Sequence, residues 1–147
     1  MKWLVSLFLV IGMAHSSMII ITIHKKVLDL YEHGKFSKQY KIAVGKKWYP
    51  YKKKYKITNK KKWPDWRPTK TILKENPFLP EVVKGGKQNP LGARAIYLGW
   101  SKYRIHGTNK PWSIGKAVSH GCFRMKNKDV MDLYSRVKKG DTVYINR

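Results

Sequence analysis

The sequence contains a single cysteine, Cys122, and only 8 acidic residues among its 147. One cysteine excludes an internal disulfide, so the folded chain must be held together by its hydrophobic core. It also excludes the paired cysteines of a C-x-x-C redox or zinc motif. No internal repeat, Gly/Ser linker or second block of distinct composition divides the chain. We therefore expect one compact domain that carries the function by itself.

The shortage of acidic residues leaves 32 lysines and arginines largely unopposed, and the formal net charge is +24 at pH 7. A surface of this sign attracts polyanions. In the cytoplasm the first candidate would be nucleic acid. Outside the membrane the candidates are anionic wall polymers, peptide carboxylates and lipid head groups. The compartment therefore decides which partner the charge predicts.

A long apolar run occurs only at the N-terminus, where Lys2 precedes residues 3–13 and small residues follow at Ala14 and Ser16. This pattern is typical of a signal peptide cleaved near Ser16, so we expect residues 1–16 to be a leader and 17–147 the mature domain. The alternative is an uncleaved membrane anchor, because apolar character resumes at residues 18–23. Both interpretations place the domain outside the cytoplasm, in the periplasm or the cell wall.

Short runs rich in β-branched and aromatic residues recur between turn residues, which is typical of β-strands. We expect strands within residues 18–23, 25–45, 55–58, 94–100, 102–107 and 142–146, with a turn at His33-Gly34. Residues 46–66, rich in Lys, Trp, Tyr and Pro, follow no period, and apart from the strand at 55–58 we expect them to be irregular. The pattern predicts a mostly β domain.

One segment has the period of an α-helix. Its apolar residues follow the i, i+3, i+4, i+7 spacing of one helix face. They are Val130, Leu133, Tyr134 and Val137. Asn127 is a candidate N-cap and Gly140 a candidate stop. We expect this to be the one helix of the domain, in its C-terminal half.

Cys122 lies in the stretch SHGCFRM, residues 119–125, between a histidine and an arginine. A cysteine with an ordinary pKa is mostly protonated at neutral pH, so a nucleophilic cysteine usually sits beside a histidine. His120 is too close along an extended chain to reach across to the sulfur freely. His106, at the end of an expected strand, is far enough upstream to return beside it. We predict that Cys122 is a nucleophile and His106 its base.

The residues around Cys122 supply the remaining requirements for cleaving an amide. A protonated His106 would donate to the departing amine. Backbone N–H groups around Gly121 and Cys122 would stabilise the oxyanion, because glycine lets a substrate approach the main chain closely. Arg124 would bind a carboxylate.

Three other interpretations remain open at this point. His106, His120 and Cys122 could bind zinc, although the chain offers no second cysteine and few carboxylates. Cys122 could be a buried and inert small hydrophobic residue. Arg124 could be one surface cation among many.

The segment IHGTNKPWSIGKAVSHGCFRMKNKDVMDLY, residues 105–134, resembles the catalytic signature of the L,D-transpeptidases, the YkuD family. The matching residues are His106, Gly107, Thr108, Gly115, Ser119, Gly121, Cys122 and Arg124. NPLG at 89–92 resembles the family motif that precedes the active-site strands, and residues 19–31 resemble its first hairpin. The likeness spans nearly the whole expected mature chain.

The resemblance implies a mostly β, sandwich-like fold and a cysteine acyltransferase that acts on peptidoglycan stem peptides. Such an enzyme cleaves the bond between the diamino acid at position three and D-alanine at position four, then passes the acyl group to an amine to form a 3→3 crosslink. By position, Cys122 is the nucleophile, His106 the base and the Gly107 carbonyl the group that orients the imidazole. Arg124, Ser119, His120, Gly121 and Thr108 would shape the substrate pocket and oxyanion site.

The segment WYPYKKKYKIT, residues 48–58, departs from the family pattern, because Tyr51 and Lys52 follow Pro50 where Thr and Gly are usual. No wall-binding repeat is present in the sequence. We hypothesise that the lysines of residues 46–62 instead hold the domain near anionic envelope polymers. A merely solvated basic face is the alternative.

Two rival functions remain. One is a hydrolase, either an L,D-carboxypeptidase or an amidase of wall peptides. The other is an exported polyanion-binding protein, in which aromatic residues interleaved with lysines act as stacking platforms, as in proteins that bind single-stranded nucleic acid. We expect a monomeric enzyme that uses neither cofactor nor metal and binds no nucleic acid.

Overall fold

The structure is a computed structural model that describes residues 16–147. Apart from Ser16, the expected leader lies outside the described residues. Within the described part of the chain, no helix is long and apolar enough to cross a membrane.

The described residues form ten strands, two α-helices and one 3-10 turn. The strands are β1 (Ser17–Thr22), β2 (Val27–Glu32), β3 (Lys35–Lys41), β4 (Val44–Gly45), β5 (Lys54–Lys62), β6 (Arg94–Leu98), β7 (Arg104–His106), β8 (Ala117–Ser119), β9 (Phe123–Arg124) and β10 (Thr142–Asn146). The helical elements are α1 (Lys70–Glu75), η1 (Pro111–Ser113) and α2 (Asn127–Arg136).

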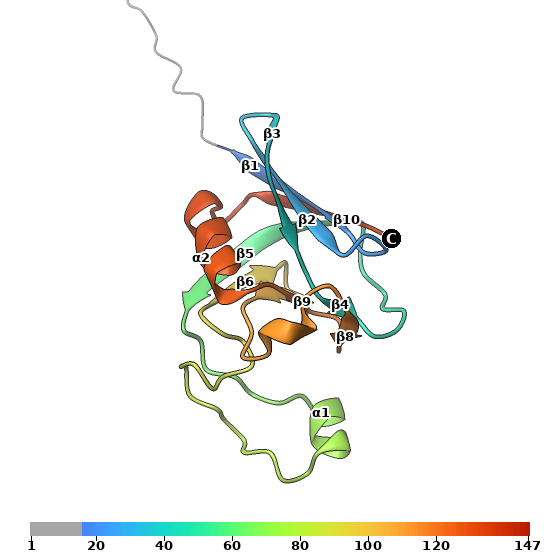
Figure 1. The fold of residues 1–147 in the computed structure, drawn as a ribbon, viewed down its shortest axis with the longest axis vertical. Helices are drawn as coiled ribbons and strands as arrows, with labels where there is room; N and C mark the ends of the chain where they lie inside the picture. The colour runs from blue at the N-terminus through green and yellow to red at the C-terminus, as the bar shows by residue number, and fades with distance from the viewer. Residues whose placement is uncertain (1–15) are drawn as a thin grey trace, which may run out of the picture.

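Eight strands form one curled sheet in the order β3-β2-β1-β10-β5-β6-β7-β9, and β4 pairs with β8 separately. The pairs β1 with β10 and β7 with β9 are parallel, and the other neighbours in the long sheet are antiparallel. Figure 1 shows β1, β2, β3 and β10 on one side of the molecule and β5, β6 and β9 on the other, with α2 beside them. This arrangement confirms the predicted mostly β, sandwich-like fold.

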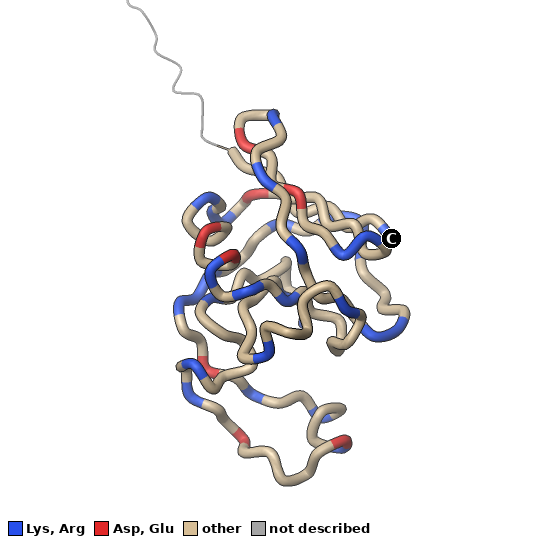
Figure 2. Tube along the Cα trace, in the orientation of Figure 1, with Lys and Arg blue, Asp and Glu red and all other residues tan. Residues whose placement is uncertain are grey.

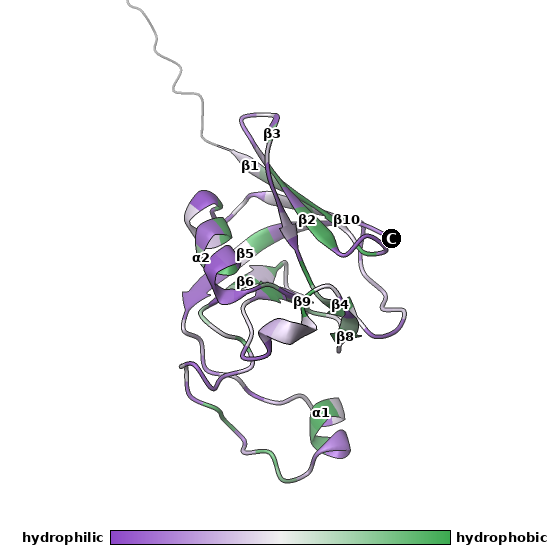
Figure 3. Cartoon of the chain, in the orientation of Figure 1, coloured by the Kyte–Doolittle hydropathy of each residue, from purple (hydrophilic) through white to green (hydrophobic). Residues whose placement is uncertain are grey.

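The core lies between the two halves of the curled sheet. On β1, Ile19 and Ile21 are fully buried while their neighbours are partly exposed, which is the alternation expected of a strand with one covered face. Val130 and Leu133 of α2 join the same cluster. In Figure 3 the hydrophobic colour follows the inner strands, and α2 is largely hydrophilic on its outer side.

The β2–β3 hairpin turns at His33-Gly34, as the sequence predicts. Both residues have positive φ angles, 53° and 74°, which is the conformation of the tight turns that fit the twist of paired strands. Glycine adopts it at little cost, and histidine tolerates it better than most residues.

The strand predicted within residues 46–66 was too short. β5 runs over nine residues rather than four, because Lys60, Lys61 and Lys62 pair with β6 although they lack hydrophobic alternation. Backbone hydrogen bonds and a neighbouring strand, which are not visible in the local pattern, extend the strand to Lys62.

The helix prediction was right for α2 but missed α1 and misplaced the ends of α2. Asn127 is the first helical residue and Lys126 occupies the N-cap position. The helix ends at Arg136, well before Gly140. There the Lys60 ammonium donates to the carbonyls of Tyr134 and Val137, both at 2.6 Å, which satisfies carbonyls that the helix end leaves open.

A long connection between β5 and β6, residues 63–93, extends away from the sheet and carries α1 at its far end (Figure 1). Asn89 is fully buried and ties the connection to itself: its amide donates to the carbonyls of Pro64, Val83 and Lys84. Thr69 caps α1 by accepting a hydrogen bond from the Ile72 N–H. Six residues are too few to display a helical period, which is why the sequence analysis missed α1.

Candidate active site

Strand pairing brings His106 and Cys122 to the same face of the sheet. β7 and β9 are parallel neighbours, with His106 opposite Arg124 and Ile105 opposite Phe123. Ile105 and Phe123 are fully buried in the core. Because side chains alternate between faces, His106 and Arg124 point away from the core. Cys122, two residues before Arg124, shares their side.

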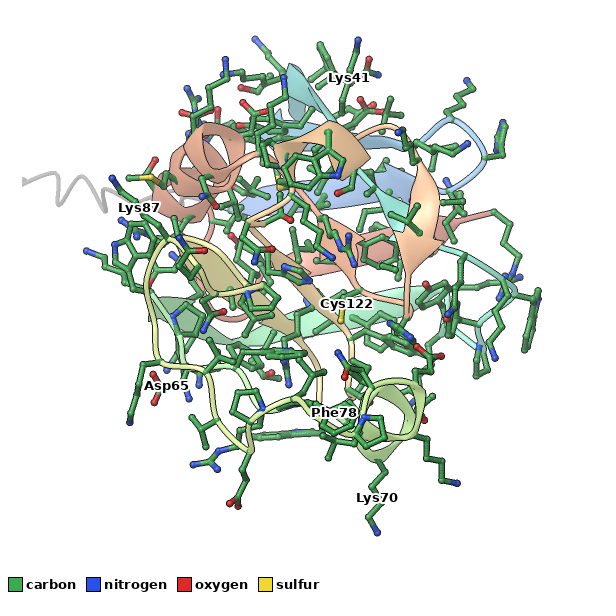
Figure 4. The ribbon with its side chains drawn as sticks, turned by 60° about the horizontal axis from the view of Figure 1, so that its bottom comes forward. Lys41, Asp65, Lys70, Phe78, Lys87 and Cys122 are labelled. Atoms are coloured by element: carbon green, nitrogen blue, oxygen red, sulfur yellow. The ribbon has the colours of Figure 1, made fainter. Side chains whose placement is uncertain are left out.

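A cleft with a volume of about 300 Å³ lies over this face, and His106, Cys122 and Arg124 all line it. The connection 63–93 contributes the opposite wall. In Figure 4 the labelled Cys122 lies between the strands and the connection, with Phe78 on the connection side. The structure therefore places in one cleft the three residues that the sequence analysis predicts as nucleophile, base and carboxylate-binding arginine.

The cleft is strongly cationic. Among its lining residues a single carboxylate, Glu75, accompanies six cationic side chains. These are Lys46, Lys47, Arg67, Lys102, Arg104 and Arg124. Figure 2 shows the same imbalance over the whole trace, where acidic residues are few. The cleft therefore favours anionic ligands.

The imidazole of His106 is fixed in one tautomer. Its Nδ1 lies 2.5 Å from the Gly107 carbonyl oxygen, which can only accept, so Nδ1 carries the proton and Nε2 has a free lone pair. The pKa of His106 is lowered to about 4, chiefly by burial; the guanidinium groups of Arg124 and Arg104 act in the same direction, and the Gly107 hydrogen bond opposes them. At neutral pH the imidazole is neutral and ready to accept a proton.

The thiol of Cys122 is also neutral at ordinary pH. Burial raises its pKa, and the nearby cations Arg104, Arg124 and Lys102 oppose that rise. Its sulfur lies 3.7 Å from the Lys102 carbonyl oxygen, within reach of a weak S–H hydrogen bond. A neutral thiol and a neutral imidazole that line one cleft would require proton transfer during attack rather than a preformed thiolate.

Ser119 stabilises the loop of residues 119–122, which carries the thiol and is called the thiol loop below. Its hydroxyl donates to the Cys122 carbonyl at 2.6 Å and accepts from the Gly121 N–H at 3.1 Å. The Gly121 N–H is therefore engaged within the loop and does not face a substrate. Of the two backbone donors that the sequence analysis considered for the oxyanion, this leaves the Cys122 N–H.

Two tyrosines that the sequence analysis did not assign to the site bind the main chain of the same loop. The Tyr51 hydroxyl donates to the Gly121 carbonyl at 2.6 Å, and the Tyr49 hydroxyl to the Ser119 carbonyl at 3.3 Å. Each contact spans 70 residues of sequence. No local pattern reveals such a contact; the only signal was the departure from the family pattern after Pro50.

His120 lines the cleft, and its ring binds a carboxylate of α1. Its Nε2 is 2.8 Å from Glu75 of α1, and the Lys46 ammonium is 3.4 Å from the other oxygen of the same carboxylate. The hydrogen bond from His120, with help from Lys46, holds the pKa of Glu75 below its usual range. His120 thus links the thiol loop to the connection 63–93.

The side chain of Asn127 explains why glycine is required at Gly92 and at Gly107. Its side-chain oxygen accepts from the N–H groups of Ala93 and Thr108, at 3.0 and 3.1 Å. A Cβ at Gly92 or at Gly107 would lie 2.2 Å from this oxygen. Both glycines are therefore required by close approach, and Gly92 also has a φ of 61°.

Thr108 does not line the cleft. Its hydroxyl accepts from the Lys110 N–H at 3.0 Å and its own N–H donates to Asn127, so it shapes the turn after β7. Within residues 16–147 no group of three or more His, Cys, Asp or Glu side chains is arranged to hold a metal ion.

A sequence model of the L,D-transpeptidase catalytic domain, the YkuD family, matches residues 16–145. The chain belongs to this family. This L,D-transpeptidase domain is 40% identical over 132 residues to the putative L,D-transpeptidase YkuD of Bacillus subtilis, a match that covers 88% of the chain and 65% of that protein. The chain therefore spans just under two thirds of the length of this relative.

Solved L,D-transpeptidases share the fold. One from Mycobacterium smegmatis superposes with a TM-score of 0.70 at 19% identity, covering 90% of this chain and 59% of that one. L,D-transpeptidase 3 from Mycobacterium tuberculosis, in complex with a faropenem-derived adduct, gives a TM-score of 0.68 at 14% identity and covers 90% and 61%. At these identities the likeness establishes the architecture, and the chemistry must be argued from this chain's own residues.

Proposed function

We propose that this domain is a cysteine acyltransferase that acts on peptidoglycan stem peptides as an L,D-transpeptidase. The observation that carries the proposal is the shared cleft of Cys122 and a neutral His106 whose Nε2 has a free lone pair. Membership of the family supplies the reaction type and the substrate class.

In the first half of the reaction, the Cys122 sulfur attacks the carbonyl carbon between the diamino acid and D-alanine. His106 Nε2 takes the thiol proton as the carbon–sulfur bond forms. The Cys122 N–H stabilises the oxyanion. The imidazolium then returns the proton to the departing nitrogen, and D-alanine leaves as the carbon–nitrogen bond breaks. A thioester on Cys122 remains.

In the second half, an amine of a neighbouring stem attacks the thioester. His106 removes a proton from this amine, the new amide bond forms, and the sulfur leaves and regains a proton. The product is a 3→3 crosslink, and the enzyme returns to its starting state. A thioester suits this exchange because it retains enough reactivity to be captured by an amine.

The cationic wall of the cleft favours the carboxylates of the stem. Arg124 lies opposite His106 across the β7–β9 pair, and its Nη1 is 3.4 Å from the Ser113 hydroxyl. This contact orients the guanidinium beside the reacting groups, where it can bind a carboxylate. Ser119 and His120 act on the site through the loop and its link to α1.

The product of one reaction tests the proposal. Purified protein is incubated with a defined tetrapeptide stem, alone and with a second stem as acceptor, and the products are separated by mass. A 3→3 dimer with release of D-alanine supports transfer. Tripeptide alone, in the presence of excess acceptor amine, would instead assign an L,D-carboxypeptidase, and an intact stem would reject both.

Location and partner belong to the same proposal. The domain acts outside the cytoplasm as a monomer, and the lysines of residues 46–62 hold it near anionic envelope polymers. In the structure Lys52, Lys53 and Lys54 are exposed. Replacing the lysines of this segment by glutamine should weaken binding to isolated cell walls and flatten its salt dependence. Unchanged binding would refute the anchoring role, and salt-sensitive DNA binding without any action on stems would favour the polyanion-binding alternative.

A further inference from the structure

Tyr51 is the residue of the unusual WYPY segment with the closest contact to the thiol loop. It is partly buried, and its ring packs against those of Tyr103 and Phe123, with centroids 4.7 and 5.3 Å away. Its hydroxyl donates to the Gly121 carbonyl at 2.6 Å. Burial also raises the pKa of this phenol, so the hydroxyl keeps its proton throughout the pH range of an envelope enzyme.

The Gly121 carbonyl and the Cys122 N–H belong to one peptide unit. A trans peptide is planar, so its C=O and its N–H point in opposite directions; the described chain has no cis peptide. A hydrogen bond that draws the carbonyl back toward Tyr51 therefore directs the N–H forward. Cys122 lines the cleft and Tyr51 does not, so we infer that an N–H directed away from Tyr51 faces the cleft.

The peptide needs such a restraint because Gly121 is conformationally permissive. Its φ is 113°, and an added Cβ would lie 2.8 Å from the Tyr103 ring and 3.2 Å from that of Tyr49. Only glycine fits here, yet glycine by itself does not fix the orientation of the peptide that follows. Ser119 restrains the neighbouring groups, namely the Gly121 N–H and the Cys122 carbonyl. The Tyr51 hydroxyl restrains the peptide between them through its hydrogen bond to the Gly121 carbonyl.

We propose that Tyr51 is a positioning residue that aims the Cys122 N–H at the oxyanion formed during acyl transfer. The proposal rests on the function argued above, since it concerns the same site. The hydroxyl of Tyr51 does not touch the substrate. It acts by fixing the peptide plane, and its hydrogen bond to the carbonyl also polarises the amide and strengthens the N–H as a donor.

Comparing two reactions of the Cys122 sulfur, acylation and alkylation, distinguishes a role of Tyr51 in orienting the N–H from a general structural role. Acylation by a carbapenem passes through a tetrahedral oxyanion, whereas alkylation by iodoacetamide displaces iodide from a saturated carbon and forms none. Tyr51→Phe keeps the ring and removes the hydroxyl. It should slow acylation by about tenfold or more, a part of what losing an oxyanion donor costs, and leave the alkylation rate unchanged.

Tyr55→Phe is the matched control. Tyr55 is another buried tyrosine, but its hydroxyl accepts from the Lys52 N–H and does not contact the thiol loop. Both rates should stay at the wild-type level in this variant. Equal loss of acylation and alkylation in Tyr51→Phe would show that Tyr51 acts on the thiol or the fold as a whole, and no loss of acylation would show that the hydroxyl is dispensable; either result overturns the proposal.

A second variant covers the case in which Tyr51→Phe does not fold. Site-specific difluorotyrosine at position 51 keeps both ring and hydroxyl but makes the phenol more acidic, so it loses its proton as the pH rises. Acylation relative to alkylation should then fall at alkaline pH in this variant and not in wild type. A parallel pH dependence of the two proteins would refute the role of Tyr51. Failure of the wild-type protein to acylate, with alkylation intact, would instead reject the proposed function.

Discussion

The two walls of the cleft are built by different means. The strand wall consists of β7, the loop 119–122 and β9, and its inward residues Ile105 and Phe123 are fully buried. The connection wall, residues 63–93, carries α1, none of whose residues is buried. It contacts the thiol loop through the exposed pair of Glu75 and His120. The groups that would react stand on the wall that the core holds rigid, whereas α1 of the other wall meets the thiol loop through an exposed polar contact, which contributes little stability.

The strand wall should give the largest effects. Cys122→Ala removes the proposed nucleophile, so incubation with the carbapenem imipenem should add no mass to the variant, whereas wild-type protein should gain one acyl adduct per chain. Intact-mass spectrometry measures this directly. An adduct on the variant would move the acylation site away from Cys122 and end the assignment.

His106, on the same wall, should control the pH profile. His106→Gln should slow acylation by about 10²–10⁴-fold, the usual contribution of a general base. In wild type the rate should stay level from neutral pH downward and fall as the pH approaches about 4, where the imidazole takes up a proton. Rates measured by stopped-flow across this range check it, and a midpoint near 6.5 would contradict the burial argument.

The same residue links pH to stability. Its pKa is about 4 when folded and 6.5 ordinarily, so between these values only the unfolded chain binds the proton. Stability should therefore rise with pH across this window and be lost as the pH falls from 6.5 to 4, by about 3 kcal/mol in all. Urea denaturation of wild type against His106→Gln isolates this contribution, which the variant should lack.

Gly92, where the connection wall returns to the sheet, should show an intermediate effect. A Cβ there would lie 2.2 Å from the Asn127 oxygen and 2.4 Å from the Thr108 nitrogen. Gly92→Ala should cost about 3 kcal/mol of unfolding free energy, measured in urea. Gly34→Ala is the control: its φ is also positive, at 74°, but nothing lies within 4 Å of the new atom. It should cost only about 1 kcal/mol, and equal losses would show that strain rather than crowding sets the cost.

The connection wall itself should give the smallest effect. Glu75→Gln removes the charge that meets His120 and Lys46. Because exposed ion pairs contribute little, KM for a stem peptide should rise less than about tenfold and kcat should change by less than about twofold. Asp65→Asn, which breaks an exposed pair with Lys84 elsewhere on the same wall, should change neither. A large fall in kcat for Glu75→Gln would mean that the two walls act as one unit.

The sequence was informative where function depends on a few residues close together in the chain. His106, Cys122 and Arg124 could be singled out because their residue types and spacing suit acyl transfer, and the family likeness of residues 105–134 agreed. The predicted mostly β fold was right because short runs rich in β-branched and aromatic residues, such as β1 and β10, are typical of strands.

The sequence analysis did not predict contacts between residues that lie far apart in the chain. Tyr51 reaches Gly121 only because β4, β8 and the strand wall come together, and α1 is too short to leave a period. Asn127 was predicted to cap α2, yet its side chain binds the main chain at Ala93 and Thr108. A polar residue at a helix start has more than one use, and only the tertiary structure shows which one applies.

The pairing of β1 with β10 also governs when the chain can fold. These are the first and last strands in the described chain, yet they are parallel neighbours in the middle of the sheet. Until β10 has emerged and is free to pair, β1 has an open edge and the sheet is split at its centre. Completion of the sheet must therefore wait for a contact between strands that are far apart in sequence, and such non-local pairing slows folding.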